Sequence, residues 1–283
     1  MILVTGAGGT LGTALTEVLQ AEGQKFRAAY HSSDAMEQAR RKGYDAVQLD
    51  FAAPETLRPA LAGVDTVFLL GTGVRGQAEK EINVVNAAKA AGVKRVVKQS
   101  VWDAAGEQYS LAQLHRSVER AVEASGLAWT FLRPNGFMQN FLHEAASIKA
   151  QGTIYQPAGE AKISHIDVRD IASVAARVLT TAGHEGKAYE LSGPQAVTYE
   201  EAANALSRVL GKKIAYVAVT DNAARAGMIA AGMPDFYADA VVDLFRAYRS
   251  GVGSRVTSQV KSVTGREPIP FEQFARDHAD VFR

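Results

Sequence analysis

The first half of the chain alternates short apolar runs with longer stretches in which apolar positions recur at helical spacing. The apolar runs predict strands at Ile2–Thr5, Phe26–Tyr30, Ala46–Leu49, Thr66–Leu70, Arg95–Gln99 and Trp129–Leu132. The stretches between them predict helices that begin near Thr10, Asp34, Pro54, Gln77 and Ser110. Strands that alternate with helices are typical of βαβ crossovers, which build parallel sheets. The pattern therefore predicts an α/β fold of the Rossmann type, with a doubly wound parallel sheet.

A glycine-rich turn joins the first predicted strand to the first predicted helix. Gly6, Gly9 and Gly12 fit the spacing G-x-x-G-x-x-G, and Gly6 with Gly8 also begins a G-x-G. A strand, a glycine turn and a helix N-terminus in this order make a site for the pyrophosphate of a dinucleotide. Gly6 would allow the tight turn, Gly9 the approach to phosphate, and Gly12 the close packing of helix on strand. The alternative is a turn with a purely structural role.

The pattern changes after Arg133-Pro134, where the predicted helices become longer and the strands shorter. Helices are expected at Phe137–Ala150, Val168–Thr180, Tyr199–Leu210, Asn222–Ala231, Phe236–Tyr248 and Phe271–Val281, and short strands near Ile154, Ile163, Ala188 and Ile214. We expect a dinucleotide-binding domain over residues 1–134 and a smaller, mostly helical substrate-binding lobe over residues 135–283. The lobe would lie across the carboxyl ends of the parallel strands, where such sheets bind ligands, so that the two parts interleave in one compact body.

Composition excludes several classes of protein. The 283 residues carry 31 basic and 30 acidic side chains without a basic block, which argues against nucleic acid as a partner. The chain has no cysteine, which excludes disulfides and thiol chemistry and fits a reducing compartment. No signal peptide is evident, and no apolar run approaches the roughly 18 residues of a membrane span. We expect a soluble, cytoplasmic monomer or homodimer without a metal site.

The end of the second predicted strand bears on the choice of cofactor. An acidic residue there would bind the ribose 2′-hydroxyl of NAD(H) and repel a 2′-phosphate. The chain instead has Tyr30-His31-Ser32-Ser33, in which His31 and the serine hydroxyls can donate hydrogen bonds to a phosphate. The absence of a carboxylate favours NADP(H) over NAD(H). The alternative is an ordinary turn before a helix capped by Asp34, which suits either cofactor.

The ends of the next three strands supply further candidates. Asp50 and Phe51 follow the third strand, where the carboxylate can accept from the adenine amino group and the ring can cover the base; the alternative is a turn aspartate before Pro54. The segment Leu69-Leu70-Gly71-Thr72-Gly73 ends the fourth strand, and its glycines would let the chain pass close to the riboses. Gln99-Ser100 ends the fifth strand and would lie near the nicotinamide.

Taken together, several motifs resemble the NmrA-like group of atypical short-chain dehydrogenases/reductases. They are Thr5-Gly6-x-x-Gly9-x-x-Gly12, Asp50-Phe51, Ala91-Gly92-Val93-Lys94-Arg95, Ser125-Gly126-Leu127, Leu132-Arg133-Pro134-x-Gly136-Phe137-Met138 and Asp167-Val168-Arg169-Asp170-Ile171-Ala172. The resemblance runs from Met1 to about Phe282, and within the group it is strongest to NAD(P)H-dependent quinone, azo-dye and triphenylmethane-dye reductases.

The resemblance implies a set of cofactor contacts. Gly6, Gly9, Thr10 and Leu11 would cradle the pyrophosphate, and His31 and Ser32 would face the 2′-phosphate. Leu70, Gly71 and Thr72 would line the ribose, while Ser100, Pro134 and Phe137 would border the nicotinamide.

One departure from the short-chain dehydrogenase pattern concerns the catalytic pair, a tyrosine followed four residues later by lysine. Tyr109 is followed at that interval by Gln113, and the resemblance aligns His115 with the lysine of many NmrA-like reductases. The departure favours the dye-reductase branch over isoflavone- or lignan-type reductases. His115 is a candidate proton donor, since a histidine pKa ordinarily lies near neutrality. The alternative is a helix-surface histidine without a catalytic role.

The chemistry of the acceptor follows from the missing pair. Hydride addition to a ketone makes a basic alkoxide, so a positioned acid is worth roughly 10² to 10⁴-fold in rate. Quinones and cationic dyes give delocalised products that need far less help, so holding the nicotinamide against a flat acceptor in a dry pocket suffices. The missing pair therefore indicates conjugated acceptors, small and aromatic or quinone-like.

An aromatic, flexible set of side chains is the candidate wall of the acceptor pocket. It consists of Trp102, Tyr109, Phe137, Met138, Phe141 and Tyr155, with His165 nearby and Asn140 as a polar anchor. Each of these side chains taken singly is also a candidate for the core. Asp167 and Asp170 are expected to be structural, as the N-cap and a first-turn acid of the helix that begins at Val168. Aromatic residues at helical spacing from Phe236 to Tyr248 are expected in the core or an interface.

The sequence thus predicts an NAD(P)H-dependent reductase of quinones, azo compounds or related dyes. A different class remains open: an NADP-binding redox sensor that regulates a partner without turnover, since NmrA-like regulators also lack the tyrosine–lysine pair. A sugar-nucleotide epimerase or dehydratase is disfavoured, because that chemistry depends on the absent tyrosine.

Overall fold

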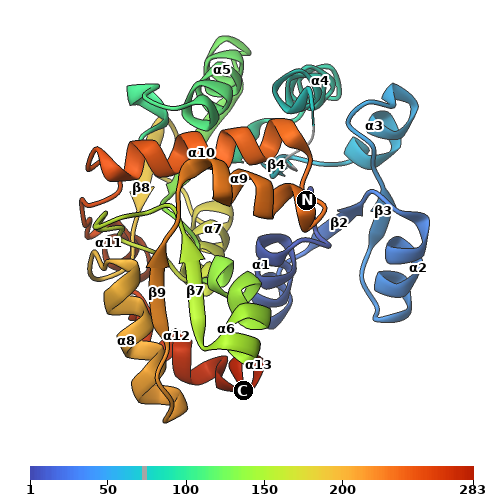
Figure 1. Ribbon diagram of the computed structural model, residues 1–283. Helices are drawn as coiled ribbons and strands as arrows, with labels where there is room; N and C mark the ends of the chain where they lie inside the picture. The colour runs from blue at the N-terminus through green and yellow to red at the C-terminus, as the bar shows by residue number, and fades with distance from the viewer. Residues whose placement is uncertain (72–74) are drawn as a thin grey trace.

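A single parallel sheet organises the first two thirds of the protein. The computed structural model describes residues 1–71 and 75–283, and its large sheet has the strand order β3-β2-β1-β4-β5-β6-β8 (Figure 1). The strands are β1 Ile2–Val4, β2 Phe26–Tyr30, β3 Ala46–Gln48, β4 Thr66–Leu69, β5 Arg95–Gln99, β6 Ala128–Pro134 and β8 Lys187–Leu191. All pairs are parallel. The Rossmann-type prediction is confirmed, with strand ends shifted by one or two residues.

Helices cover both faces of this sheet. They are α1 Thr10–Ala21, α2 Ser33–Arg41, α3 Pro54–Leu61, α4 Gln77–Ala90, α5 Ser110–Ala124 and α7 Val168–Thr180. Figure 1 shows α3, α4 and α5 together on one side and α1 and α7 on the other. Leu11, Leu15 and Leu19 form the buried stripe of α1, as apolar residues at helical spacing should. The predicted helix starts are confirmed, except that α2 begins at Ser33.

The second half of the chain builds a smaller lobe in front of the sheet (Figure 1). Its elements are η2 Met138–Glu144, α6 Ala145–Gln151, β7 Thr153–Gln156, α8 Tyr199–Leu210, β9 Ala215–Ala218, α9 Asp221–Ala230, α10 Asp235–Arg249, α12 Phe271–Asp277 and α13 Ala279–Phe282. Helix α11 Gln259–Thr264 packs instead against α7 and β8 of the large sheet, and η1 Ala104–Gly106 follows β5. Strands β7 and β9 pair as a second, parallel sheet. An apolar cluster that includes Phe141, Ile154 and Leu206 holds the lobe together.

Three predicted elements of the second half differ in the structure. The expected helix at Phe137–Ala150 opens as the 3₁₀ segment η2, and the expected helix at Phe271–Val281 is interrupted at His278 between α12 and α13. The expected strand near Ile163 is a single antiparallel bridge to Val197. Short 3₁₀ stretches and single bridges carry no periodic pattern of their own, so the apolar pattern did not distinguish them from regular elements.

The strand expected near Ala188 belongs to the large sheet rather than to the small lobe. It is β8, which pairs with β6 in the register Phe131 to Ala188, and the preceding α7 packs against α1. The chain therefore leaves the large sheet at Pro134, builds η2, α6 and β7, and then returns to it. The boundary at residue 134 stays a prediction.

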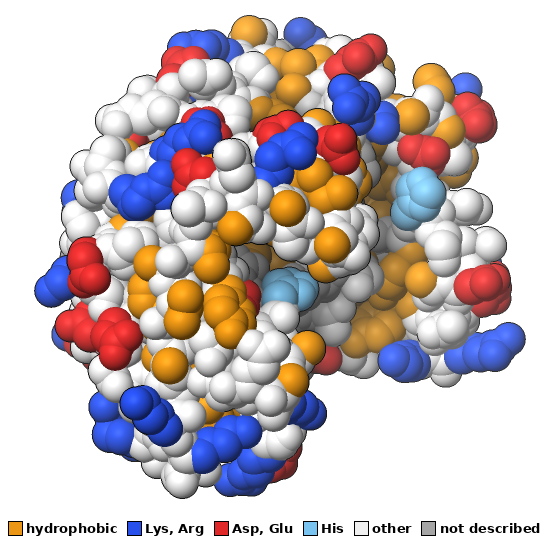
Figure 2. Space-filling model, viewed as in Figure 1, with side chains coloured by type: hydrophobic (Ala, Val, Ile, Leu, Met, Phe, Trp, Pro, Cys, Tyr) orange, Lys and Arg blue, Asp and Glu red, His pale blue; other side chains and the backbone are white. Residues whose placement is uncertain are grey.

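The arrangement leaves a hollow between the small lobe and the part of the sheet that carries α2 and β3. Figure 2 shows this hollow, with apolar side chains along parts of its walls. The carboxyl ends of parallel strands are where doubly wound sheets bind ligands, and helix α1 begins at that edge, after β1. In the described ranges no helix combines the length and hydropathy needed to cross a membrane.

Candidate functional site

The turn between β1 and α1 is built around glycines whose absent side chains are a steric requirement. Gly6 has a φ of +62°, in the left-handed region that favours glycine. A Cβ on Gly12 would lie 2.0 Å from the carbonyl oxygen of Gly6, well inside contact distance. A Cβ on Gly9 would meet only that same oxygen, at 3.4 Å. Gly6 and Gly12 therefore fix the shape of the turn, whereas Gly9 leaves open space beside the helix end.

The first turn of α1 offers unpaired backbone donors to that space. The amide of Thr13 donates to the carbonyl of Gly9 over 2.8 Å, and the amides of residues 10 to 12 precede this first helical bond. Gly9 and Thr10 are exposed, and no side chain caps the helix. Aligned peptide dipoles add positive potential at this end, so the turn has the features of an anion site.

Replacing Gly12 by alanine is expected to destabilise the whole fold. The new Cβ would sit 2.0 Å from the Gly6 carbonyl oxygen and 2.7 Å from the Ala7 Cα, both backbone atoms that cannot rotate away. Overpacking of this kind costs about 3 kcal/mol or more in free energy of unfolding. Urea unfolding measures it, with Gly9→Ala as the control of equal bulk; equal stabilities of the two variants would contradict the steric argument.

Helix α2 begins at the end of β2 with a cap that the sequence did not indicate. The Ser32 hydroxyl oxygen accepts from the amide of Ala35 over 3.1 Å, so Ser32 is the N-cap, and Asp34 lies in the first turn. The alternative in which Asp34 caps this helix is therefore wrong. A hydroxyl that accepts at the helix end keeps its own proton for donation.

His31 stands beside a carboxylate from the neighbouring strand end. Its imidazole is 82% exposed, and its Nε2 lies 3.6 Å from Oδ2 of Asp50. The other oxygen of Asp50, Oδ1, accepts from the amide of Ala52 over 2.9 Å. Phe51 is half-buried against the core between the sheet and α3. The structure thus brings His31, Ser32, Asp50 and Phe51 together at the edge formed by β2 and β3.

The end of β4 is hydrogen-bonded to the start of the glycine turn and packs closely against it. The Thr5 hydroxyl oxygen accepts from the amide of Leu70 over 2.8 Å, and a Cβ on Gly6 would lie 3.1 Å from the carbonyl oxygen of Leu70. A Cβ on Gly71 would meet Oε1 of Glu81 at 2.1 Å, so only glycine fits there while Glu81 keeps its place. Thr72, also expected at the ribose, lies outside the described residues.

Glu81 belongs to a buried ion pair that the sequence analysis missed. The Lys98 ammonium on β5 and the Glu81 carboxylate on α4 are both fully buried, with Nζ and Oε2 2.5 Å apart. Lys98 also donates to the carbonyl of Gln99, and the Gln77 amide donates to Oε1 of Glu81 over 2.7 Å. The available signal was the position of Lys98 inside the run Val96-Val97-Lys98, because parallel strands are buried on both faces.

A second buried network engages Ser100. Its hydroxyl donates to Oε1 of Glu119 over 2.7 Å, and Arg133 binds both oxygens of that carboxylate and reaches Glu190 over 3.2 Å. Burial opposes ionisation of Glu119, but hydrogen bonds from Arg133 and Ser100 prevail and lower its pKa. Ser100 was expected to border the nicotinamide; the structure instead directs its fully buried hydroxyl into this network.

His115 lies inside the protein and not on a helix surface. It is 8% exposed, and its Nδ1 has no hydrogen-bond partner among the described residues. Burial and the nearby charge of Lys98 hold its pKa well below the ordinary value of 6.5. The expectation of a pKa near neutrality is therefore corrected: His115 is a neutral imidazole, which is a poor proton donor.

Much of the expected acceptor wall lies in the interior. Trp102 and Tyr109 are at most 2% exposed, and the Trp102 indole donates to the carbonyl of Val252 over 2.7 Å while the Tyr109 hydroxyl donates to the carbonyl of Trp102. Met138 and Phe141 are buried in the core of the small lobe. These four side chains therefore lie in the core, the alternative that the sequence left open for each of them, and contact with an acceptor through them would require the interior to open.

The remaining predicted residues differ in how far they are exposed. Phe137 is half-buried and pairs with Ile166 in a single bridge, while Pro134 is a buried residue at the end of β6. Asn140 is exposed, and Tyr155 is 38% exposed with its hydroxyl donating to Gln151 over 2.6 Å. Asp167 accepts from the amide of Arg169 over 2.9 Å as the N-cap of α7, which confirms its predicted structural role.

His165 is buried beside the turn that follows β6. Its Nδ1 lies 3.3 Å from the carbonyl oxygen of Gly136, and burial lowers its pKa from 6.5 to about 4. In the unfolded chain the same imidazole titrates near its ordinary value, so the unfolded state binds more protons between these two values.

Acid is therefore expected to destabilise the protein through His165. The neutral imidazole of His165 contributes fully to the free energy of unfolding above its ordinary pKa of 6.5, and this contribution is lost as the pH falls toward 4. The size of the pKa shift corresponds to a loss of about 3 kcal/mol in total. Urea unfolding across this range, compared between wild type and His165→Gln, isolates the effect because every other group is shared. Parallel stability curves for the two proteins would contradict it.

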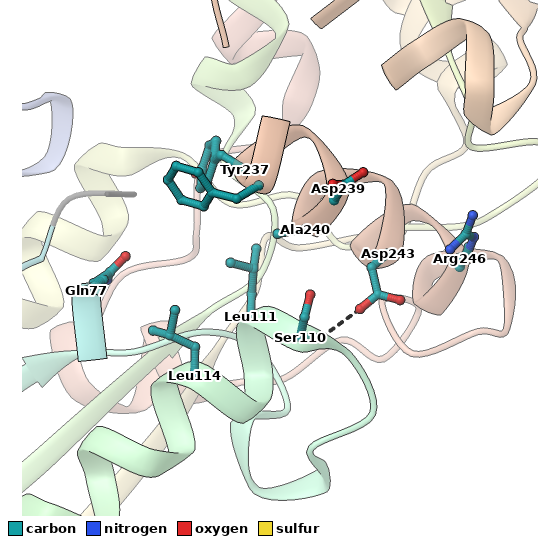
Figure 3. A pocket seen from close by; sticks show the side chains of 10 residues that line it. Gln77, Ser110, Leu111, Leu114, Tyr237, Asp239, Ala240, Asp243 and Arg246 are labelled. Atoms are coloured by element: carbon teal, nitrogen blue, oxygen red, sulfur yellow. Dashed lines mark hydrogen bonds between the residues drawn. The ribbon is translucent and has the colours of Figure 1, made fainter. Parts of the chain in front are cut away.

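An open cavity of about 420 Å³ lies between α5 and α10 (Figure 3). Figure 3 shows Leu111 and Leu114 reaching it from α5 and Tyr237 from α10, with Gln77 at the start of α4. Burial raises the pKa of Tyr237. The sequence analysis placed Phe236 and Tyr237 in the core or an interface; both line this cavity, whereas Phe245 and Tyr248 are buried in the small lobe.

Comparison with known proteins settles the family. The profile of the NmrA-like family matches residues 1–269. The chain belongs to the NmrA-like family. An NmrA-like relative, the NAD(P)H azoreductase of Xenophilus azovorans, is 39% identical over 285 residues that cover 100% of this chain and 99% of its own.

Solved NmrA-like structures match the fold over nearly the full length. The NADPH-dependent quinone oxidoreductase of Escherichia coli complexed with NADPH superposes with a TM-score of 0.90 at 30% identity, covering 100% of both chains. The Citrobacter sp. triphenylmethane reductase complexed with NADP(H) gives a TM-score of 0.87 at 28% identity, covering 98% of this chain and 99% of its own. The resemblance of the motifs to NmrA-like reductases is confirmed.

Proposed function

We propose that this NmrA-like protein is an NADP(H)-dependent reductase that transfers hydride to a conjugated acceptor such as a quinone, an azo compound or a dye. The observation that carries the proposal is the exposed N-terminus of α1, with its free amides behind a turn whose shape requires glycine at positions 6 and 12. The activities named for the relatives, azoreductase and quinone oxidoreductase, support the same class of acceptor.

The residues that would hold the cofactor surround that helix end. Gly6, Gly9, Thr10 and Leu11 fit a pyrophosphate, because the amides before Thr13 have no helical acceptor. His31 and Ser32 present an imidazole and a free hydroxyl proton to a 2′-phosphate, and Asp50 and Phe51 suit the adenine. Leu70 and Gly71 would border the ribose; Pro134 and Phe137 would border the nicotinamide.

The chemistry is hydride transfer followed by protonation of the product. Bound NADPH would supply the hydride, the acceptor is reduced by two electrons, and NADP⁺ leaves. Neither of the two candidate groups is a ready acid, since burial and the charge of Lys98 hold the pKa of His115 well below its ordinary value and the Ser100 hydroxyl donates to Glu119. Protonation of the reduced acceptor is therefore left to water. Such a site favours acceptors whose reduced form is delocalised and weakly basic.

Steady-state oxidation of NADPH with a panel of quinones and azo dyes tests the proposal. Acceptor-dependent turnover is expected, with the reduced acceptor formed in equal amount to NADP⁺. Tight NADPH binding without turnover on any acceptor would favour the alternative, a redox-sensing regulator that binds NADP without catalysis.

Replacing His31 by aspartate is expected to shift cofactor preference toward NADH. A carboxylate at this exposed position, next to Asp50, would repel a 2′-phosphate and accept from a ribose 2′-hydroxyl. We expect the ratio of kcat/KM for NADPH to that for NADH to fall by about tenfold or more, since one close charge pair is worth roughly 1.4 kcal/mol or more. His31→Gln, without the charge, is the control. An unchanged ratio would show that this turn does not select the cofactor.

A further inference from the structure

The cavity between α5 and α10 is a second site that the cofactor residues do not use. This inference rests on the proposed function: we propose that the cavity holds the flat aromatic part of the acceptor, and that Leu111, Leu114, Phe236 and Tyr237 determine which acceptors fit. Its volume of about 420 Å³ lies in the range of small-molecule pockets.

The topology places this cavity on the nicotinamide side of the sheet. Helix α4 follows β4 and α5 follows β5, so the start of each helix lies at the carboxyl edge, and Gln77 and Ser110 at these starts line the cavity. The second strand reads the adenosine ribose, so a dinucleotide with its pyrophosphate at α1 extends its other half from β1 toward β4 and β5. Adjacent strands are about 4.8 Å apart, so β5 lies only about 10 Å from β1.

The walls of the cavity are apolar side chains that stay partly exposed. Leu111, Leu114, Phe236 and Tyr237 are all half-buried, and they converge on the cavity from two helices (Figure 3). The rings of Phe236 and Tyr237 have centroids 6.4 Å apart and planes inclined by 64°, so one ring can face a planar ligand while the other meets it edge-on. The Arg75 guanidinium lies 5.0 Å from the Phe236 ring centroid and holds that ring by a cation–π contact.

Three charged side chains, Asp239, Asp243 and Arg246, stand at the rim of the cavity, and two of them form ion pairs. Asp243 accepts from the amide of Ser110 over 2.7 Å and so fastens α10 to the start of α5 (Figure 3). Asp239 pairs with Arg225, and Arg246 pairs with Asp221. Asp243 has no ion-pair partner among the described residues and keeps its negative charge at the rim, while the apolar walls suit the ring of a quinone or of an azo compound.

Filling the cavity tests the proposal. The variant Leu111→Trp, compared with wild type in the full-length protein, is expected to lower kcat/KM for 1,4-naphthoquinone by about tenfold or more, mainly through KM, with the Kd of NADPH changed less than about twofold. Val281→Trp is the matched control, since it adds the same bulk at a 40% exposed position on α13, far from α10 in Figure 1. For a benzoquinone, which is smaller, kcat/KM of Leu111→Trp should fall by less than it does for naphthoquinone.

The outcomes separate this proposal from the function on which it rests. A folded, active Leu111→Trp protein with unchanged kcat/KM for naphthoquinone would overturn the cavity as the acceptor site and leave the reductase standing. An inactive wild type that binds NADPH would overturn the proposed function itself. If Leu111→Trp does not fold, the same kinetic measurement on Leu114→Phe and Tyr237→Ala tests whether the cavity binds the acceptor. We expect a raised KM for naphthoquinone in both variants.

Discussion

Replacing Gly9 by aspartate is expected to abolish dinucleotide binding while the fold stays intact. The backbone at Gly9 is extended, with φ −83° and ψ 172°, which any residue adopts, and a Cβ there would meet only the Gly6 carbonyl oxygen at 3.4 Å. Aspartate is also a favourable residue at a helix N-cap, so the stability of the protein should not fall. Its carboxylate would occupy the space in front of the free amides and repel a pyrophosphate.

The expected loss in NADPH affinity is at least about 100-fold, which corresponds to about 2.7 kcal/mol in binding free energy. Calorimetric titration with NADPH measures it, and thermal unfolding checks the fold. Gly9→Asn is the control, because asparagine has the same size and capping ability without the charge. Equal losses in the two variants would mean that bulk and not charge is responsible; undiminished binding in Gly9→Asp would place the pyrophosphate elsewhere.

Removing one partner of the Lys98–Glu81 pair is expected to be the most destabilising change to the sheet. In Lys98→Met the Glu81 carboxylate would remain fully buried with only the Gln77 amide against it. Breaking a buried pair in this way costs about 3–5 kcal/mol in free energy of unfolding, because an uncompensated charge stays inside. A loss of this size lowers Tm by about 10 °C in a chain of this length.

The double variant Lys98→Met/Glu81→Gln provides the control within the same site. It removes both charges and keeps an amide oxygen to accept from Gln77, so most of the lost stability should return. Urea unfolding of the two single variants, the double variant and wild type gives the coupling free energy. A double variant as unstable as the sum of its single changes would show that packing, and not charge, dominates at this position.

Local patterns predicted the parts of the fold that depend on local physics. Neighbouring residues determine the conformation of a strand such as Arg95–Gln99 and of the glycine turn after Val4. The structure agrees with both predictions. Strand β8 could not be assigned to the large sheet in this way, because its partner β6 lies more than 50 residues earlier and its sequence, Lys187–Leu191, is half polar. The apolar periodicity of a sequence does not show which distant segments pair as strands.

The candidate site was predicted unevenly for similar reasons. The pyrophosphate turn depends on glycines whose backbone role is visible in spacing, whereas the buried state of His115 depends on what covers α5. The sequence did contain an indication that His115 is buried. The spacing of Ala112, His115, Glu119 and Val122 puts them on one face of the helix, and the structure buries all four. Lys98 was missed because a lone lysine is ordinarily exposed, and only its burial partner Glu81, 17 positions earlier, makes the interior position stable.

The late return of the chain to the sheet has a consequence for synthesis on the ribosome. When the nascent chain has emerged only as far as Pro134, β6 presents an open strand edge and α1 lacks the helix that packs against it. Open edges recruit other chains, so this growing intermediate is the stage most exposed to aggregation and most in need of chaperones. Once Leu191 has left the exit tunnel, β8 can pair with β6, and the edge of the sheet passes to β8, whose charged residues Lys187 and Glu190 make it less prone to recruit other chains.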